Sequence, residues 1–106
     1  MIEVNVYDDK KLAGTLKYDK INYIFTYNDD FLNTKETSAI SLTLPKRQKP
    51  FVSQTLHPFF SGLLAEGSLK ALQCKQLKID ENDDFTRLIN TAKEDTIGTV
   101  IIGEIL

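Results

Sequence analysis

One histidine and a nearby serine are the first residues whose chemistry could be catalytic. His57 is the only histidine of the chain, and Ser61 follows it by four residues, a spacing that places both on one face of a helix. Such a pair could support acyl transfer, but that chemistry also needs an orienting acid and an oxyanion hole, and the chain contains no G-x-S-x-G motif. We therefore expect His57 to pack beside Pro58 at a helix start, with a small Ser61–His57 enzyme as the alternative.

The single cysteine could be a reactive thiol. Cys74 lies between Leu72 and Leu77, and three lysines follow or precede it closely, at positions 70, 75 and 78. Neighbouring cations can lower the pKa of a thiol. A lone cysteine on a helix is more often a small apolar core residue, and we expect that role for Cys74.

A run of acidic residues has part of the spacing of a calcium loop. Asp80, Asn82 and Asp84 would take the first, third and fifth positions of an EF-hand, which also requires glycine at the sixth and glutamate at the twelfth. This chain has Phe85 and Thr91 there. We expect a negatively charged helix N-terminus instead, stabilised by the helix dipole, and we predict no metal and no cofactor.

Basic residues gather in one short segment between two prolines. Lys46, Arg47 and Lys49 could contact phosphate or an acidic partner. The segment lacks interleaved aromatic residues and a recognition-helix pattern, and the five glycines form no phosphate-binding motif. A solvated loop is the expectation, and a small nucleic-acid-binding module using residues 46–49 is the alternative.

Length and composition favour one ordinary globular domain. The chain has 106 residues, 42% of them apolar and 26% charged, with a formal net charge of −2. These values are far from those of disordered chains, and the charge argues against a protein that coats phosphate backbones. A single cysteine cannot form an internal disulfide, and no apolar run approaches the length of a membrane span. We expect one domain, residues 1–106, in the cytoplasm, with no membrane contact.

Alternating apolar residues predict strands in the first half and at the end of the chain. The period-2 segments 2–7, 12–18 and 21–27 suggest an antiparallel meander, in which Leu12, Leu16 and Tyr18 share one side. Gly14 marks a bulge or a close backbone approach. Residues 28–32 suit one helical turn, residues 40–44 a fourth strand that Pro45 ends, and residues 99–102 a last strand.

Helical spacing dominates the middle of the chain. Apolar residues at spacings of three and four predict a helix over 56–64, a second over 69–77 after Gly67, and a third over 85–92 with Asn82 and Asp83 as capping candidates. The fold class is therefore α+β, a single domain with a mostly antiparallel sheet packed against two to three helices.

Several segments in a fixed order resemble one family. Residues 40–45 (ISLTLP) and 56–67 (LHPFFSGLLAEG) are similar to "isLsLP" and "pfFxxLLPEg" of the N-terminal subdomain of HipA-like serine/threonine kinases. Residues 94–100 resemble its "GxDxxGal", residues 13–16 its "vGxL" and residues 23–27 its "yxFxY". Ala65 replaces a usual proline and Lys93 a usual glycine.

The resemblance implies a function without catalysis. HipA-like kinases continue into a catalytic core, whose motifs are absent from these 106 residues, so we expect a non-enzyme. A separate chain of this kind is similar to the HipS family, the small subunits of tripartite HipBST toxin–antitoxin systems. That likeness implies an antitoxin that binds and neutralises a HipT-like kinase, with HipB-like DNA-binding protein as a possible third member. A non-inhibitory assembly or stabilising subunit is the alternative.

A detached subdomain should carry an apolar docking patch. We expect it in two places: the interhelical loop, where Gly67 permits a sharp turn and Glu66 or Ser68 could meet cationic groups, and the C-terminal apolar residues. The candidate interface residues are Ala65, Glu66, Gly67, Ser68, Ile101, Ile102, Ile105 and Leu106.

Overall fold

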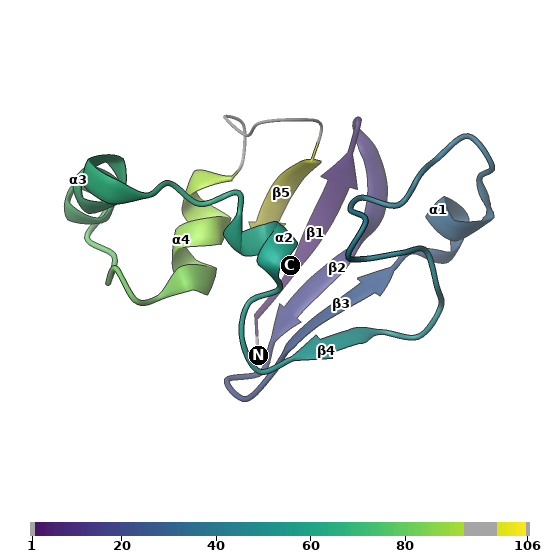
Figure 1. Cartoon of the computed structure of the whole chain (residues 1–106), viewed down its shortest axis with the longest axis horizontal. Coiled ribbons are helices and arrows are strands. Elements are labelled where there is room, and N and C mark those ends of the chain that lie inside the picture. The colour runs from purple at the N-terminus through teal and green to yellow at the C-terminus, as the bar shows by residue number, and fades with distance from the viewer. Residues whose placement is uncertain (1, 93–99, 106) are drawn as a thin grey trace.

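The computed structural model describes residues 2–92 and 100–105, and these form a five-stranded antiparallel sheet with helices (Figure 1). The strand order is β4-β3-β2-β1-β5. The strands are β1 Ile2–Asp8, β2 Lys11–Tyr18, β3 Tyr23–Tyr27, β4 Phe51–Ser53 and β5 Val100–Ile105. The helices are α1 Asp29–Asn33, α2 Pro58–Ser61, α3 Gly67–Leu77 and α4 Asp84–Thr91. The α+β class and the antiparallel meander are confirmed.

The first hairpin follows from its turn residues. Asp9 and Lys10 both have positive φ, 50° and 67°, which is the backbone of the two-residue turn that matches the twist of paired strands. The alternation in β1 then places Val4 and Val6 in the core, while Glu3 points to the opposite face and forms an ion pair with Lys17 at 3.2 Å. One face of the sheet is therefore packed and the other is open.

A bulge in β2 overturns one prediction. Val6 pairs with Gly14 and Tyr7 with Leu12, so Ala13 has no partner in β1. The extra residue moves Leu12 to the opposite face from Leu16. Ala13 is buried, and Leu12 is 37% exposed. The expectation that Leu12 shares a side with Leu16 and Tyr18 is wrong for this reason.

Gly14 marks a close backbone approach, as predicted. A Cβ atom at this position would lie 2.2 Å from the carbonyl oxygen of Thr26 in β3. Only glycine permits the two strands to pair at this distance.

The predicted fourth strand over residues 40–44 is wrong. Ser41 to Leu44 form a tight turn, in which the Leu44 amide donates to the Ser41 carbonyl at 3.1 Å and Leu42 is fully exposed. The buried Tyr27 hydroxyl accepts from the Ile40 amide at 3.1 Å and donates to the Leu44 carbonyl. A side chain thus satisfies backbone groups that a strand would pair, and the fourth strand lies at Phe51–Ser53 instead.

The last predicted helix is confirmed with its cap. Phe85, Leu88 and Ile89 are buried on α4. The carboxylate of Asp83 accepts a hydrogen bond from the Thr86 amide at 3.1 Å, the arrangement of an N-cap. This helix packs on the covered face of the sheet, with Phe60 of α2 beside it in the same core.

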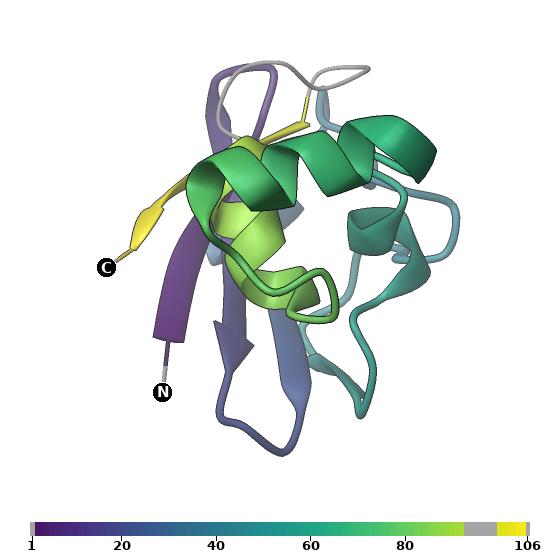
Figure 2. The same cartoon turned by 90° about the vertical axis from the view of Figure 1, so that its left-hand side faces the viewer.

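The helix predicted over 56–64 is much shorter in the structure. Helix α2 ends at Ser61, and the Leu63 and Leu64 amides donate to Phe60 and Ser61 in successive turns. Helix α3 forms as predicted but buries only Cys74. It lies outside α4, as the two views show (Figures 1 and 2).

Candidate functional site

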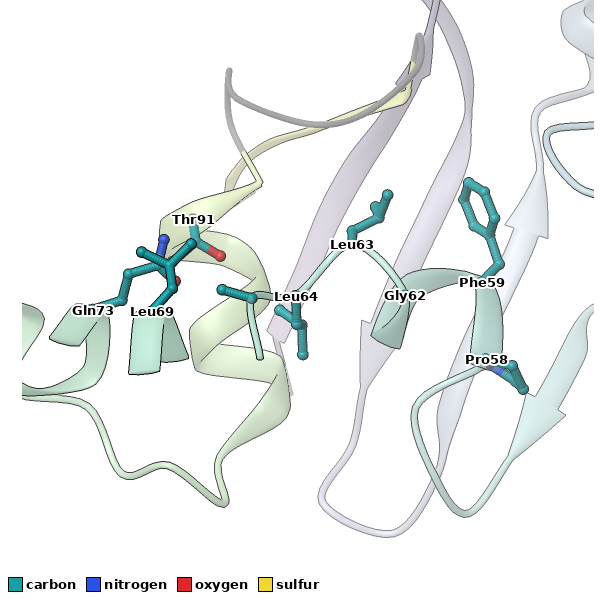
Figure 3. Close-up of a pocket in the computed structure, with 9 residues that line it drawn as sticks. Pro58, Phe59, Gly62, Leu63, Leu64, Leu69, Gln73 and Thr91 are labelled. Carbon is teal, nitrogen blue, oxygen red and sulfur yellow. The ribbon is translucent and has the colours of Figure 1, made fainter. Parts of the chain in front are cut away.

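An apolar groove separates α2 and its following loop from α3 (Figure 3). Its volume is about 630 Å³. Residues of α2 and the loop form one wall, and residues of α3 and α4 form the other. The lining residues include Phe59, Leu63, Leu64, Ala65, Leu69 and Gln73.

The groove exists because α2 stops early. Phe59, Leu63 and Leu64 are only partly buried, and they pack with their inner sides against the hydrophobic core. Their outer sides face the groove. On the other wall, Leu69 of α3 is 53% exposed. Apolar surface of this kind, backed by a packed core, favours contact with another protein.

The predicted interhelical loop adjoins this groove. Ala65 lines it, and Glu66, Gly67 and Ser68 follow as exposed residues at the start of α3. Gly67 has φ +62°, which confirms the sharp turn expected there. Leu64 and Ala65 also line a second, more polar hollow of about 370 Å³. The loop and the groove therefore form one continuous surface.

A buried arginine holds the loop in place. Arg87 of α4 is 5% exposed, and its Nη2 atom donates to the carbonyl oxygen of Ala65 at 2.7 Å. Its Nη1 atom lies 3.3 Å from the carboxylate of Asp84. The spacing of Asp84 and Arg87 in the sequence could have indicated their ion pair. Nothing in the sequence indicates the bond to Ala65, which joins residues 22 positions apart.

The C-terminal interface candidates lie in different environments in the structure. Ile102 is fully buried in the core of this chain, so the expectation that it lies on an exposed patch is wrong. Its alternation with Ile101 explains this, because β5 turns one side chain to the covered face and the next away from it. Ile101 is half-buried. Ile105 pairs with Val4 at the backbone, and Leu106 lies outside the described residues.

The structure does not assemble a Ser–His nucleophile. The Ser61 hydroxyl donates to the Pro58 carbonyl at 3.1 Å, and Nε2 of His57 lies 2.9 Å from the Phe51 carbonyl. Nδ1 of His57 is buried without a hydrogen-bond partner. Burial lowers the pKa of this imidazole below its usual value. His57 is a packed residue at the start of α2, as expected.

The other chemical candidates have structural roles. Cys74 is a buried free thiol on α3. Asp80 accepts from the Asn82 amide at 2.8 Å in a turn that precedes the Asp83 cap. In the described part of the chain, no three side chains of metal-binding type lie close enough together to hold an ion.

Two of the three basic loop residues are used within the chain. Nζ of Lys46 donates to the Thr34 and Thr37 carbonyls at 3.1 and 2.8 Å, and it lies over the Phe31 ring. The Arg47 guanidinium stacks 3.7 Å above the Phe51 ring centre. Lys46 and Arg47 are therefore held by contacts within the chain. This weakens the alternative that residues 46–49 bind nucleic acid. Among the described residues, no helix has the length and apolarity needed to cross a bilayer.

Comparison with known proteins gives a consistent result. The profile of the family described as the HipA N-terminal domain matches residues 4–103. A protein of Haemophilus influenzae, itself uncharacterized, is 38% identical over 94 residues, which cover 89% of this chain and 84% of that protein. A protein of Sinorhizobium fredii named as a candidate kinase, Y4mE, is 34% identical over 86 residues. These cover 80% of this chain but only 20% of that protein.

A solved structure supports the same assignment. The chain is similar to the structure described as the N-terminal domain of HipA toxin, with a TM-score of 0.72 and 33% identity. The similarity covers 98% of this chain and 94% of that one. Sequence profile, relatives and fold agree over nearly the whole length, and the chain belongs to the HipA N-terminal domain family.

Proposed function

We propose that this chain binds the catalytic core of a HipA-family kinase and neutralises it, without catalysis of its own. Its family associates it with HipA-type toxin–antitoxin systems. In this role the chain takes the place beside a kinase core that the related domain takes when it is part of the same polypeptide.

The distribution of relatives supports binding between separate chains. The same domain makes up most of the Haemophilus protein and one fifth of the Sinorhizobium protein that is named as a candidate kinase. When the same domain makes up most of one protein and a small part of a longer one, we expect its surface to fit the rest of the longer protein. The separate form must then hold its partner by noncovalent contacts.

The apolar groove is the observation that carries this proposal. Phe59, Leu63, Leu64 and Leu69 offer partly exposed apolar surface, and the groove they line is large enough to receive several side chains of a partner. Interfaces owe most of their affinity to such pockets when apolar or aromatic anchors fill them. Glu66 lines the adjoining polar hollow, and Ser68 is exposed at the start of α3.

Co-purification with the kinase tests the binding. A HipA-family kinase core from the same genome, expressed with the tagged chain, should form a complex of micromolar affinity or tighter. Leu69→Asp should weaken the complex at least tenfold, because it places a charge in the groove wall. Leu42→Asp is the matched control, since Leu42 is fully exposed on the turn between residues 41 and 44. Absence of a complex, or equal effects of the two variants, would contradict the proposal.

Kinase activity separates neutralisation from assembly. Purified kinase core should lose autophosphorylation when the wild-type chain is added, and retain it when Leu69→Asp is added at the same concentration. Cells that express the toxic kinase should grow again when the wild-type chain is co-expressed, and should not when Leu69→Asp is co-expressed. An active kinase within a stable complex would instead identify the chain as an assembly or stabilising subunit.

A further inference from the structure

Helix α3 carries three leucines that the rest of the described chain covers only about half. Leu69, Leu72 and Leu77 are 53%, 51% and 48% exposed, and Cys74 is the one buried residue of this helix. In Figure 2, α3 lies across the front of the molecule, outside α4. Three leucines on an outermost helix are unusual for a face that meets only water.

The three leucines lie on one side of the helix, and we call them the stripe, although two glutamines interrupt it. At about 100° per residue, Leu72, Leu69 and Leu77 fall within an arc of about 140°, with Gln73 and Gln76 between them. Cys74 lies on the other side of the helix, which packs toward the domain. The stripe therefore begins at the groove, where Leu69 is one of the lining residues, and continues onto the outer surface.

Positive charge borders this stripe. Lys70 and Lys75 lie on its two flanks by the same helical geometry, and Lys78 follows at the C-terminal cap. Glu81 lines the same hollow as Lys75, and Glu66 and Asp84 the same hollow as Lys70, but within the described residues neither lysine forms an ion pair. The ammonium groups of Lys70 and Lys75 are therefore available to pair with acidic side chains of a partner.

We propose that the outer face of α3 binds an amphipathic helix of the partner, whose apolar stripe is bordered by glutamate or aspartate. The identification of that partner with the kinase rests on the proposed function. An apolar seam would pack against the leucines, and acidic side chains would pair with Lys70 and Lys75, as the flanking positions of paired helices do. Helix α3 has 11 residues and is about 16 Å long, which gives room for three turns of the partner.

A membrane is the competing surface for a basic helix with exposed leucines. Two observations favour a protein helix. Glutamines interrupt the apolar arc at Gln73 and Gln76, and no aromatic residue lies on α3 to anchor it at a lipid interface. The stripe also opens into the groove at Leu69, a concave surface that suits a protruding side chain better than a flat bilayer.

A model peptide provides a test that does not need the kinase. The probe is a three-heptad amphipathic peptide of leucine and glutamate that carries one tryptophan, a clean reporter because the protein has no tryptophan. Wild-type protein should bind it at micromolar concentration and bind the leucine–lysine counterpart at least tenfold more weakly. The affinity for the glutamate peptide should fall as salt is raised.

Two surface variants with matched controls locate the binding. Leu72→Asp should weaken binding of the glutamate peptide at least tenfold, and Lys75→Glu at least fivefold with partial loss of its salt dependence. Leu42→Asp and Lys35→Glu place the same charges on exposed positions outside α3 and should leave the affinity unchanged. Circular dichroism of each variant checks that the fold is retained.

The outcomes separate this inference from the proposed function. The acidic-helix assignment is overturned if the protein binds both peptides equally, or if Lys75→Glu binds the glutamate peptide as tightly as wild type does. This holds even where the kinase complex forms and depends on Leu69. Binding to phosphatidylserine vesicles that Leu72→Asp abolishes, without peptide binding, assigns the face to a membrane and overturns it too. Peptide binding with the expected selectivity, in the absence of any kinase complex, supports the acidic-helix assignment and contradicts only the proposed partner.

Discussion

Arg87 donates a hydrogen bond from Nη2 to the carbonyl oxygen of Ala65 at 2.7 Å, and this contact joins α4 to the loop before α3. The arginine is almost fully buried, and the Ala65 carbonyl is its shortest hydrogen-bond acceptor, while Asp84 lies 3.3 Å away with a side chain that is 44% exposed. Because Ala65 lines both the groove and the neighbouring polar hollow, the same bond sets the position of the candidate binding surface.

Replacing Arg87 should destabilise the fold and weaken partner binding together. Arg87→Met keeps much of the apolar stem but removes the donor to Ala65, at an expected cost of about 1–3 kcal/mol in the free energy of unfolding. Urea denaturation measures this, and hydrogen exchange at residues 65–68 should accelerate. Asp84→Asn is the control and should cost under about 1 kcal/mol, since Asp84 is largely solvated. Equal costs would contradict the role assigned to Arg87.

Two glycines should respond very differently to alanine. Gly14→Ala places a methyl group 2.2 Å from the Thr26 carbonyl oxygen, and it should cost more than about 3 kcal/mol or abolish folding. Gly67→Ala meets no atom within 4 Å and should cost about 1 kcal/mol, because only its positive φ disfavours a side chain. Thermal unfolding of both variants, with Gly67→Asn as a residue that tolerates positive φ, tests the distinction.

The Tyr27 hydroxyl should carry measurable stability. Tyr27→Phe leaves the Ile40 amide and the Leu44 carbonyl without their buried partner, and we expect a loss of about 1–3 kcal/mol. Tyr7→Phe is the matched control on the open face, where the hydroxyl accepts only a 3.3 Å bond from Asn5. It should change stability by less than about 0.5 kcal/mol. Denaturant titration of both variants measures the difference, and equal losses would contradict the role of Tyr27.

Acid should destabilise the protein in part through His57. Its pKa is lowered by burial, while in the unfolded chain it returns to the usual 6.5, so the unfolded state binds more protons below that pH. Stability is therefore highest with neutral imidazole and falls as the pH drops through about 6.5. His57→Gln retains an amide that can donate to the Phe51 carbonyl but does not titrate. The variant should lose less stability than wild type between about pH 7.5 and pH 5.

Denaturation midpoints of wild type and His57→Gln across this range provide the measurement. The carboxylates titrate in both proteins, so the difference between the two curves isolates the histidine. Parallel curves would show that His57 is not protonated differently in the folded and unfolded states.

Local patterns were sufficient for the elements that local forces determine. Helix α4 could be predicted because its apolar residues follow the helical period and Asp83 caps it. The meander could be predicted because strand alternation is regular and polar residues mark the turns. The close approach at Gly14 followed from the position of a glycine inside a strand pattern.

Apolar alternation gave wrong strand predictions where residues distant in the sequence hydrogen-bond to the backbone, or where a bulge interrupts the strand. Residues 40–44 have the pattern of a strand, yet the hydroxyl of Tyr27 holds Ile40 and Leu44 in a turn. The period-2 pattern predicts that Leu12 shares a face with Leu16, but the bulge at Ala13 places Leu12 on the opposite face. Neither a bulge nor a long-range hydrogen bond changes the hydrophobic period that the sequence displays.

The family and the α+β class could be predicted from the order and spacing of residues along the chain, and the interhelical loop as an interface stays a prediction. Long-range packing determines that α2 ends at Ser61, that a groove opens there, and that Arg87 holds the loop. It also determines that Ile102 is buried while the leucines of α3 are exposed. Apolar periodicity is the same for a face that packs inward and one that faces a partner, and only the position of each helix in space distinguishes them.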